Sequence, residues 1–150
     1  MTSWGDVGHA TVRGVVGAMA MSGVRNITSE IGLIRDPPPV ALAKRASRTR
    51  LRHVPKRLRR PLIELLHWQV GAVGGATFAV LPDSVRKQAW AGPAWGVLIQ
   101  SSFGLVIAPA LGLKQAKRPS AREQAALLVD HLLYGYVLSD LPRGRRDEDA

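Results

Sequence analysis

The chain has 150 residues, which is enough for one domain, and its mean hydropathy of +0.01 is that of an average globular protein. Its charge is distributed unevenly. The 26 residues between Lys87 and Lys114 contain no Asp, Glu, Lys or Arg, whereas residues 35–60 contain ten Lys or Arg. The absence of cysteine excludes a disulfide framework, a thiol nucleophile and a thiolate metal site. This segregation of charge indicates a membrane protein with a basic loop, not a uniformly amphipathic globule.

Four apolar segments approach the length of about 20 residues that a membrane-spanning helix needs. In chain order they cover residues 8–34, 61–81, 89–113 and 121–141. The third has no charge and the second contains only Glu64, whereas the first is interrupted by Arg13 and Arg25 and the fourth by Asp130. We therefore expect an all-α fold, a four-helix transmembrane bundle that forms a single domain over residues 1–150.

Small residues recur at every fourth position in three of these segments. The ridges are Ala10, Gly14, Ala18 and Ser22; Gly71, Gly75 and Ala79; and Gly92, Gly96, Gly104, Ala108 and Gly112. Helices in lipid associate by close approach of their backbones, which such ridges permit. Glycine at this density would destabilise a helix exposed to water. The ridges therefore predict helix packing, and we expect them to support self-association of the chain as well.

The order of motifs predicts two repeated helical hairpins. Gly32 and Gly112, each followed by leucine, end the first and third segments. Basic residues and proline follow each of them, and then a helix that carries His-x3-Gly, beginning at His67 or His131. Ser120 followed by Glu123 has the spacing of a capping box and predicts that the last helix begins near residue 121. Two hairpins in one orientation are typical of parallel-repeat membrane proteins.

The basic loop over residues 35–60 sets the expected orientation, because loops rich in Lys and Arg stay on the cytoplasmic side. Both termini are then expected on the opposite side of the bacterial cytoplasmic membrane. Anionic lipid headgroups are the nearest partners for the basic side chains. A protein or nucleic-acid partner is the alternative, but the loop has no aromatic residue for base stacking, so we expect no nucleic acid. The residues expected to contact headgroups are Lys44, Arg45, Arg48, Arg50, Arg52, Lys56, Arg57, Arg59 and Arg60.

Four short motifs resemble those of the YagU-like family of uncharacterised bacterial inner-membrane proteins. They are Gly17-Ala-Met-Ala-Met21, the prolines of residues 37–39, His131-Leu-Leu-Tyr134-Gly135 and its weaker copy His67-Trp-Gln-Val-Gly71. In the copy, Val70 stands where Tyr134 stands in the last helix, a departure from the pattern. The resemblance implies a small integral membrane protein and supplies no reaction.

Polar residues inside the apolar segments form the candidate site, because ionisable groups at membrane depth are costly and therefore often functional. The expected intramembrane cluster comprises Arg25, Glu64, His67, Gln100, Asp130 and His131. We expect Arg25 to pair with Asp130, and His67 to hydrogen-bond to His131 across the helices. Such a cluster serves either as packing contacts or as a proton or ion relay.

A metal site is a further alternative for this cluster. Glu64 and His67 have the Glu-x-x-His spacing that di-metal bundles use, but the last helix lacks that spacing and the third has no carboxylate. We therefore expect no metal and no cofactor.

No catalytic constellation is present in the sequence. The glycines of residues 71–75 lack the Lys-Ser/Thr ending of a phosphate loop. We expect a non-enzymatic structural or interaction component of the membrane. One alternative is a subunit of an oligomeric small-solute, ion or proton transporter, and another is a soluble or peripheral protein that binds nucleic acid through residues 44–60.

Overall fold

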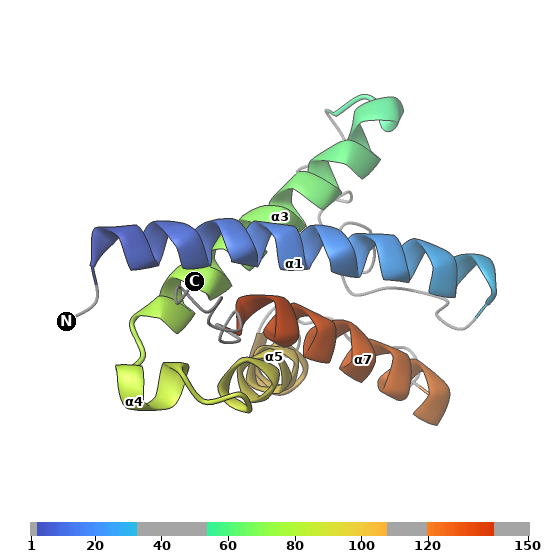
Figure 1. Ribbon diagram of the computed structural model, residues 1–150. Helices are drawn as coiled ribbons and strands as arrows, with labels where there is room; N and C mark the ends of the chain where they lie inside the picture. Colours follow the sequence, from blue (N-terminus) through green and yellow to red (C-terminus); the bar gives the residue numbers. More distant parts are fainter. Residues whose placement is uncertain (1–2, 33–53, 108–119, 140–150) are drawn as a thin grey trace, which may run out of the picture.

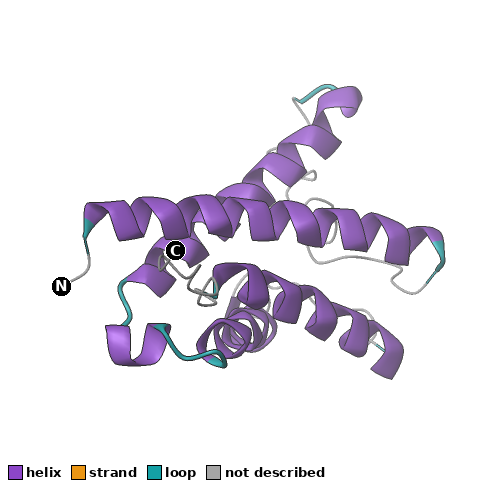
Figure 2. Ribbon diagram, in the orientation of Figure 1, coloured by secondary structure: helices purple, strands orange, loops and turns teal. Residues whose placement is uncertain are grey.

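The computed structural model describes residues 3–32, 54–107 and 120–139, most of which are helical (Figures 1 and 2). In chain order these are α1 (Trp4–Glu30), α3 (Lys56–Ala79), α4 (Asp83–Arg86), α5 (Ala91–Ser102), the π-helical turn η2 (Phe103–Ile107) and α7 (Ala121–Leu138). The described residues contain no strand, so the all-α prediction is confirmed.

Local sequence signals account for most helix boundaries. Ser3 caps α1 and Ser120 caps α7, each in a capping box with the acidic residue three positions on, as the sequence predicted for α7. α3 ends at Ala79, three residues before Pro82 and two residues short of the end of the predicted segment 61–81. α3 begins at Lys56, so the last five residues of the predicted basic loop are helical, and Pro61 lies inside this helix.

α3 crosses α1 obliquely, α7 runs alongside α1, and α5 is seen nearly end-on beneath them (Figure 1). The α1–α3 contact is backbone against backbone. A Cβ atom added to Gly75 would overlap the carbonyl oxygen of Ala10, and one added to Gly14 would overlap that of Gly71. The predicted small-residue ridges of residues 10–22 and 71–79 are buried at this crossing.

α5 packs against α7 in the same manner. A Cβ atom on Gly96 would overlap the carbonyl oxygen of His131, and one on Gly135 would overlap that of Gly92. Gly104, also predicted to belong to this ridge, has nothing within 4 Å of an added Cβ atom. The other two ridge positions, Ala108 and Gly112, lie outside the described residues.

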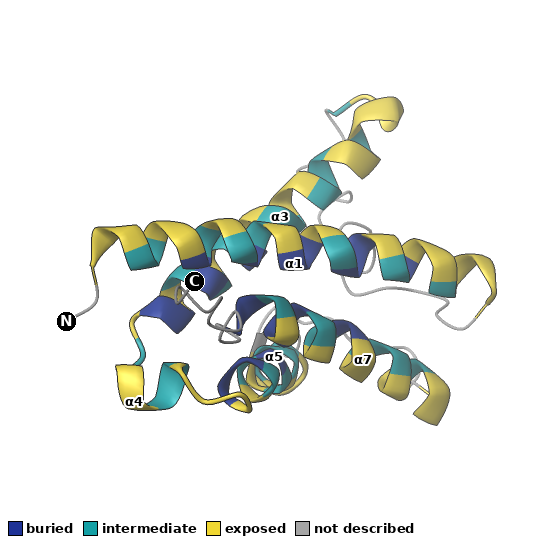
Figure 3. Cartoon of the chain, in the orientation of Figure 1, coloured by how far each residue is buried: buried dark blue, intermediate teal, exposed yellow. Residues whose placement is uncertain are grey.

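The buried apolar core is small and lies where α1, α3, α5 and α7 meet. It comprises Met21, Phe78, Ala91, Tyr134 and Leu138. The rings of Phe78 and Trp95 pack against each other with their centroids 6.0 Å apart. Burial is concentrated on the inward faces of the helices, and most of the outer surface of each helix is exposed (Figure 3).

The prediction of a multi-pass membrane protein is wrong: none of the described helices is both long enough and apolar enough to cross a bilayer. The reason differs between segments. α1 carries Arg13 and Arg25 within its central turns, and α7 carries Asp130. The third segment, predicted as one uncharged span, has an α-helix of only 12 residues followed by η2. The predicted transmembrane bundle, the location in the cytoplasmic membrane and the orientation of the termini are withdrawn with it.

Candidate functional site

A buried pair of opposite charges joins α1 to α7. Arg25 on α1 is 6% exposed and Asp130 on α7 is 1% exposed, and the Nε atom of Arg25 lies 3.8 Å from the Oδ2 atom of Asp130. The predicted pairing of these two residues is therefore present. At 3.8 Å the contact is an ion pair but exceeds hydrogen-bonding distance. Both carboxylate oxygens, and the Nε and Nη1 atoms of Arg25, are buried without a hydrogen-bond partner.

His67 adds α3 to this cluster. The Nη2 atom of Arg25 lies 3.0 Å from the Nε2 atom of His67, and since a guanidinium only donates, the imidazole accepts and is neutral. Burial, together with the positive charge of Arg25, lowers the pKa of His67 to about 4. Arg25 is thus the common partner of one residue from each of the other two helices.

His131 does not hydrogen-bond to His67, contrary to expectation. Its Nδ1 atom lies 2.8 Å from the carbonyl oxygen of Leu127, one turn earlier on α7, and therefore carries the proton. The prediction was wrong because a histidine inside a helix can donate to a backbone carbonyl oxygen of its own helix. The positions of the two histidines in their segments do not reveal this alternative partner. Burial lowers the pKa of His131, although the bond to Leu127 opposes this shift.

Asp130 is the group of the cluster whose titration is moved toward neutral pH. Burial raises the pKa of its carboxyl group to about 6, and the positive charge of Arg25 only partly offsets this shift. A carboxyl group in a dry environment favours its neutral form unless hydrogen bonds stabilise the charge. Near pH 6 the buried pair therefore changes from a neutral acid beside a cation to an ion pair.

Glu64 and Ser22 form a second polar contact between α1 and α3. The hydroxyl of Ser22 donates to the Oε2 atom of Glu64 at 2.6 Å and accepts from the indole nitrogen of Trp68 at 3.3 Å. Gln100, also predicted for the cluster, is half-buried on α5. Among the described residues no three His, Cys, Asp or Glu side chains converge to hold a metal ion.

Tyr134 makes a contact between helices that the sequence analysis did not predict. Its buried hydroxyl donates to the carbonyl oxygen of Gly71 at 2.7 Å and so ties α7 to α3. The ring also fills the space left by Gly17 on α1. The signal for this contact was present in the sequence, because Tyr134 stands in the His-Leu-Leu-Tyr-Gly motif of the resemblance.

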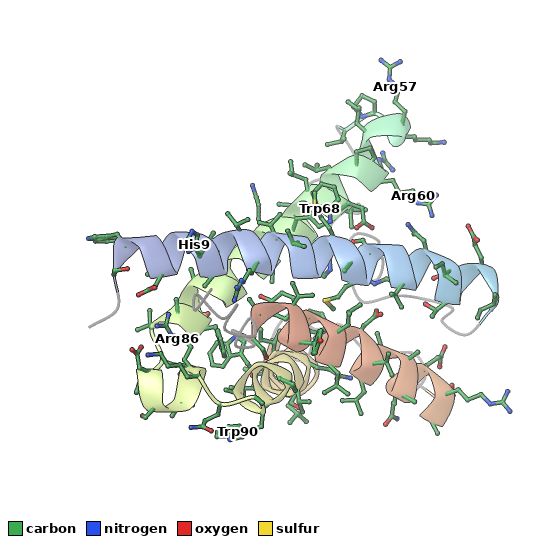
Figure 4. All side chains as sticks on the ribbon, in the orientation of Figure 1. His9, Arg57, Arg60, Trp68, Arg86 and Trp90 are labelled. Carbon is green, nitrogen blue, oxygen red and sulfur yellow. The ribbon has the colours of Figure 1, made fainter. Side chains whose placement is uncertain are left out.

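The basic residues expected to meet headgroups are only partly described. Lys44, Arg45, Arg48, Arg50 and Arg52 lie outside the described residues. Lys56, Arg57 and Arg60 are exposed on the first turns of α3, where Arg57 and Arg60 point outward (Figure 4). Arg59 donates from Nε to the carbonyl oxygen of Val54 at 3.0 Å. Their contact with lipid headgroups stays a prediction.

Large apolar side chains cover the outer faces of the helices. On α3, the exposed residues Leu66, Val70, Val73, Thr77 and Val80, the last just beyond the helix, form a line that we call the α3 seam. At the carboxyl end of the seam an apolar groove of about 420 Å³ lies between α3 and the first turns of α1, beside Trp4, which is 91% exposed. Contiguous exposed apolar surface is typical of interaction sites.

Comparison with known proteins gives no match: no protein-family model, curated protein or solved structure is similar to this chain. The resemblance to the YagU-like family stays a prediction from the four motifs.

Proposed function

We propose that the chain is a non-enzymatic interaction protein that pairs with a second copy of itself through the α3 seam. The observation that carries the proposal is the spacing of the seam, whose residues follow one another at intervals of four, three, four and three. This is the heptad interval at which one helix presents a straight apolar stripe to another. None of the five residues of the seam carries a charge.

The glycine ridges do not serve this purpose in the described residues, although the sequence suggested it. Gly14, Gly71 and Gly75 are occupied by the α1–α3 crossing, and Gly92, Gly96 and Gly135 by the α5–α7 crossing. The α3 seam lies on the opposite side of its helix, where its residues are exposed in the described part of the chain. We therefore assign self-association to the seam.

Charge favours an antiparallel arrangement of the two copies of α3. The first turn of this helix carries Lys56, Arg57 and Arg59, with Arg60 following. A parallel pair would bring these two basic ends together, at a cost in repulsion. An antiparallel pair places each basic end beside the carboxyl end of the partner helix, where the helix dipole is negative.

The two-fold axis of an antiparallel pair would pass beside Val73. Leu66 of one copy then meets Val80 of the other, and Val70 meets Thr77. The seam runs from Leu66 to Val80, about 21 Å along the helix axis. The apolar groove beside Trp4 continues this surface and would bury further apolar side chains of the partner.

Substitution at the centre of the seam tests the proposal. Val73 is 63% exposed, so Val73→Lys leaves the fold intact and places two like charges on the proposed axis. We expect the dissociation constant of the dimer, measured by sedimentation equilibrium of the full chain, to rise at least tenfold. This corresponds to a loss of about 1.4 kcal/mol or more in the free energy of dimerisation. Val129→Lys on α7 is the matched control, because Val129 is 57% exposed and lies outside the seam. A wild-type chain that is monomeric at all concentrations, or equal dissociation of both variants, would contradict the proposal.

Cysteine scanning tests the direction of pairing, since the chain has no cysteine of its own. Val73→Cys is expected to form a disulfide-linked dimer under mild oxidation. In the antiparallel arrangement the two copies of residue 80 are about 20 Å apart, so Val80→Cys is expected to stay unlinked. Rapid linkage through Val80→Cys would show a parallel pair instead.

A further inference from the structure

We infer that residues 56–65, which we call the amino end of α3, bind the surface of an anionic lipid bilayer without crossing it. The polar and backbone contacts with α1 described above involve residues 64–75 of α3. Residues 56–63 precede these contacts, and this end of the helix projects beyond α1 (Figure 1). Leucines on one side of the amino end and basic residues on the other carry the inference.

The apolar side of the amino end is a row of three leucines. Leu58, Leu62 and Leu65 follow one another at intervals of four and three, so they lie along one side of the helix. Leu58 and Leu65 are each 49% exposed, and Leu62 is half-buried. At 3.6 residues per turn the leucine row lies roughly 130° from Gly71 and Gly75, which face α1. The leucine row therefore points away from α1 and can approach a flat surface.

The basic side of the amino end lies opposite the leucine row. Lys56, Arg57 and Arg60 are centred roughly 160° from the row at the same helical repeat. All three are exposed, and Arg57 and Arg60 point outward (Figure 4). Within the described residues, none of the three forms an ion pair with a carboxylate. Their positive charge is thus available to an external partner.

The position of these charges favours an anionic partner. The first turn of α3 has no acidic residue, and Pro55, which precedes it, supplies no side-chain hydrogen bond. The amino terminus of a helix is the positive end of its dipole, so basic residues there are unfavourable for the helix itself. A surface of negative charge would offset this repulsion.

The leucine row distinguishes a bilayer from other polyanions. A helix with an apolar side and an opposite side of Lys and Arg lies in the plane of a bilayer surface, with its apolar side at the boundary of the acyl chains. Nucleic acid would engage the basic side and leave the leucines in water, and residues 56–65 contain no aromatic residue for base stacking. An anionic bilayer uses both sides, because headgroup phosphates meet the basic residues and acyl chains cover the leucines.

Lipid binding and the proposed dimer use different parts of α3. In the antiparallel pair Leu66 of one copy meets Val80 of the other, and the partner helix ends at Ala79. Residues before Leu66 therefore extend past the partner helix, and the leucine row stays accessible. The inference does not depend on the dimer.

Sedimentation of the full chain with lipid vesicles tests the inference. We expect binding to vesicles made of equal parts of phosphatidylglycerol and phosphatidylcholine, and binding weaker by roughly tenfold or more to phosphatidylcholine alone. The double substitution Arg57→Gln and Arg60→Gln should weaken binding to the anionic vesicles by roughly tenfold or more. Leu58→Gln should weaken it by roughly threefold or more, because it removes one apolar side chain from the inserted row.

Matched substitutions on other helices serve as controls. Arg122 is exposed in the first turn of α7 and Leu98 is 53% exposed on α5, so Arg122→Gln and Leu98→Gln should bind as the wild type does. Absence of vesicle binding by the wild type, or an equal loss in the controls, would overturn the inference. A loss in the double arginine variant without a loss in Leu58→Gln would indicate attraction to any polyanion, nucleic acid included, and would overturn it as well.

A polarity-sensitive fluorescent label gives a second test that leaves every basic residue in place. The chain has no cysteine, so Leu58→Cys and Leu98→Cys each provide one labelling site. Anionic vesicles should shift the emission of the label at position 58 to shorter wavelength and leave the label at position 98 unchanged. A shift at both positions, or at neither, would contradict insertion of the leucine row.

Discussion

The α1–α3 pair and the α5–α7 pair use the same backbone contact and different polar chemistry. Gly71 rests on the carbonyl group of Gly14 in the first pair, and Gly135 rests on that of Gly92 in the second. The histidine one turn before each of these glycines behaves differently. His67 accepts from Arg25 on the neighbouring helix, whereas His131 donates to its own helix.

The difference shows that the close helix crossing at glycine residues does not depend on the buried charges beside it. Close backbone contact needs only small residues at the right interval, and both pairs have them. The buried charge depends on one additional residue, Arg25 on α1, which reaches both α3 and α7. The charged cluster therefore joins α1 to both α3 and α7 through Arg25, whereas the glycine crossing is a feature of each pair by itself.

The largest expected effect comes from filling the crossings. Gly75→Ala and Gly96→Ala each place a methyl group against a carbonyl oxygen, so each is expected to lower the free energy of unfolding by about 3 kcal/mol. Gly23→Ala is the control: an added Cβ there meets nothing within 4 Å, and we expect a gain of about 0.5–1 kcal/mol. Chemical denaturation measures all three. A large loss in one pair only would show that the two crossings are not equivalent.

The pH dependence of stability should distinguish the two titratable partners of Arg25, Asp130 and His67. The pKa of Asp130 is raised from 3.8 to about 6, so between these values the unfolded chain binds fewer protons and stability falls as pH rises. The pKa of His67 is lowered from 6.5 to about 4, so in nearly the same window stability rises with pH. In the wild type these two slopes oppose each other.

Removing either group should uncover the slope of the other. Asp130→Asn is expected to gain about 2 kcal/mol between pH 4 and pH 6.5, helped by His131, whose pKa is also lowered. His67→Gln keeps an acceptor for Arg25 and is expected to lose stability from pH 4 to pH 6, by about 1 kcal/mol, because the lowered pKa of His131 partly opposes the slope of Asp130. Unfolding curves at half-unit pH intervals measure both. Slopes of the same sign in the two variants would refute the assignment.

The smallest expected effect concerns the position at which the motif of residues 131–135 differs from its copy in residues 67–71, which is Tyr134 in the first and Val70 in the second. Tyr134→Phe leaves the carbonyl of Gly71 without its buried donor and should cost about 1–2 kcal/mol. Val70 occupies the corresponding place in α3 and is exposed, so Val70→Phe should change the free energy of unfolding by less than about 0.5 kcal/mol. Thermal unfolding compares the two, and equal losses would contradict the difference drawn here.

The sequence predicted the elements that depend on local chemistry. The capping box at Ser120 and the burial of the first two small-residue ridges follow from spacing alone, and both are present, as is the burial of Gly92 and Gly96 in the third ridge. The Arg25–Asp130 pair was also predictable, because two opposite charges on apolar helix faces have few other partners.

What could not be predicted depends on how the helices lie in three dimensions. Composition placed the outer apolar residues in lipid, because hydropathy does not separate a lipid-facing stripe from a surface that meets another protein. The third segment was predicted to be one membrane-spanning helix because it has no charge. Its change from α-helix to a π-helical turn at Phe103 could not be predicted from its amino-acid composition. The partner of His131 was missed for a similar reason, because its own backbone lies nearer than the neighbouring helix.

The neighbouring small residues of α1 have a consequence for how this chain can vary. Gly14 faces α3 and Gly17, three positions later, faces Tyr134 of α7. One turn of a single helix thus fixes the separation of both neighbours. A bulkier residue at position 14 would displace α3, and a bulkier residue at position 17 would displace α7. Substitutions at these two positions should therefore weaken the α1–α3 contact and the α1–α7 contact independently.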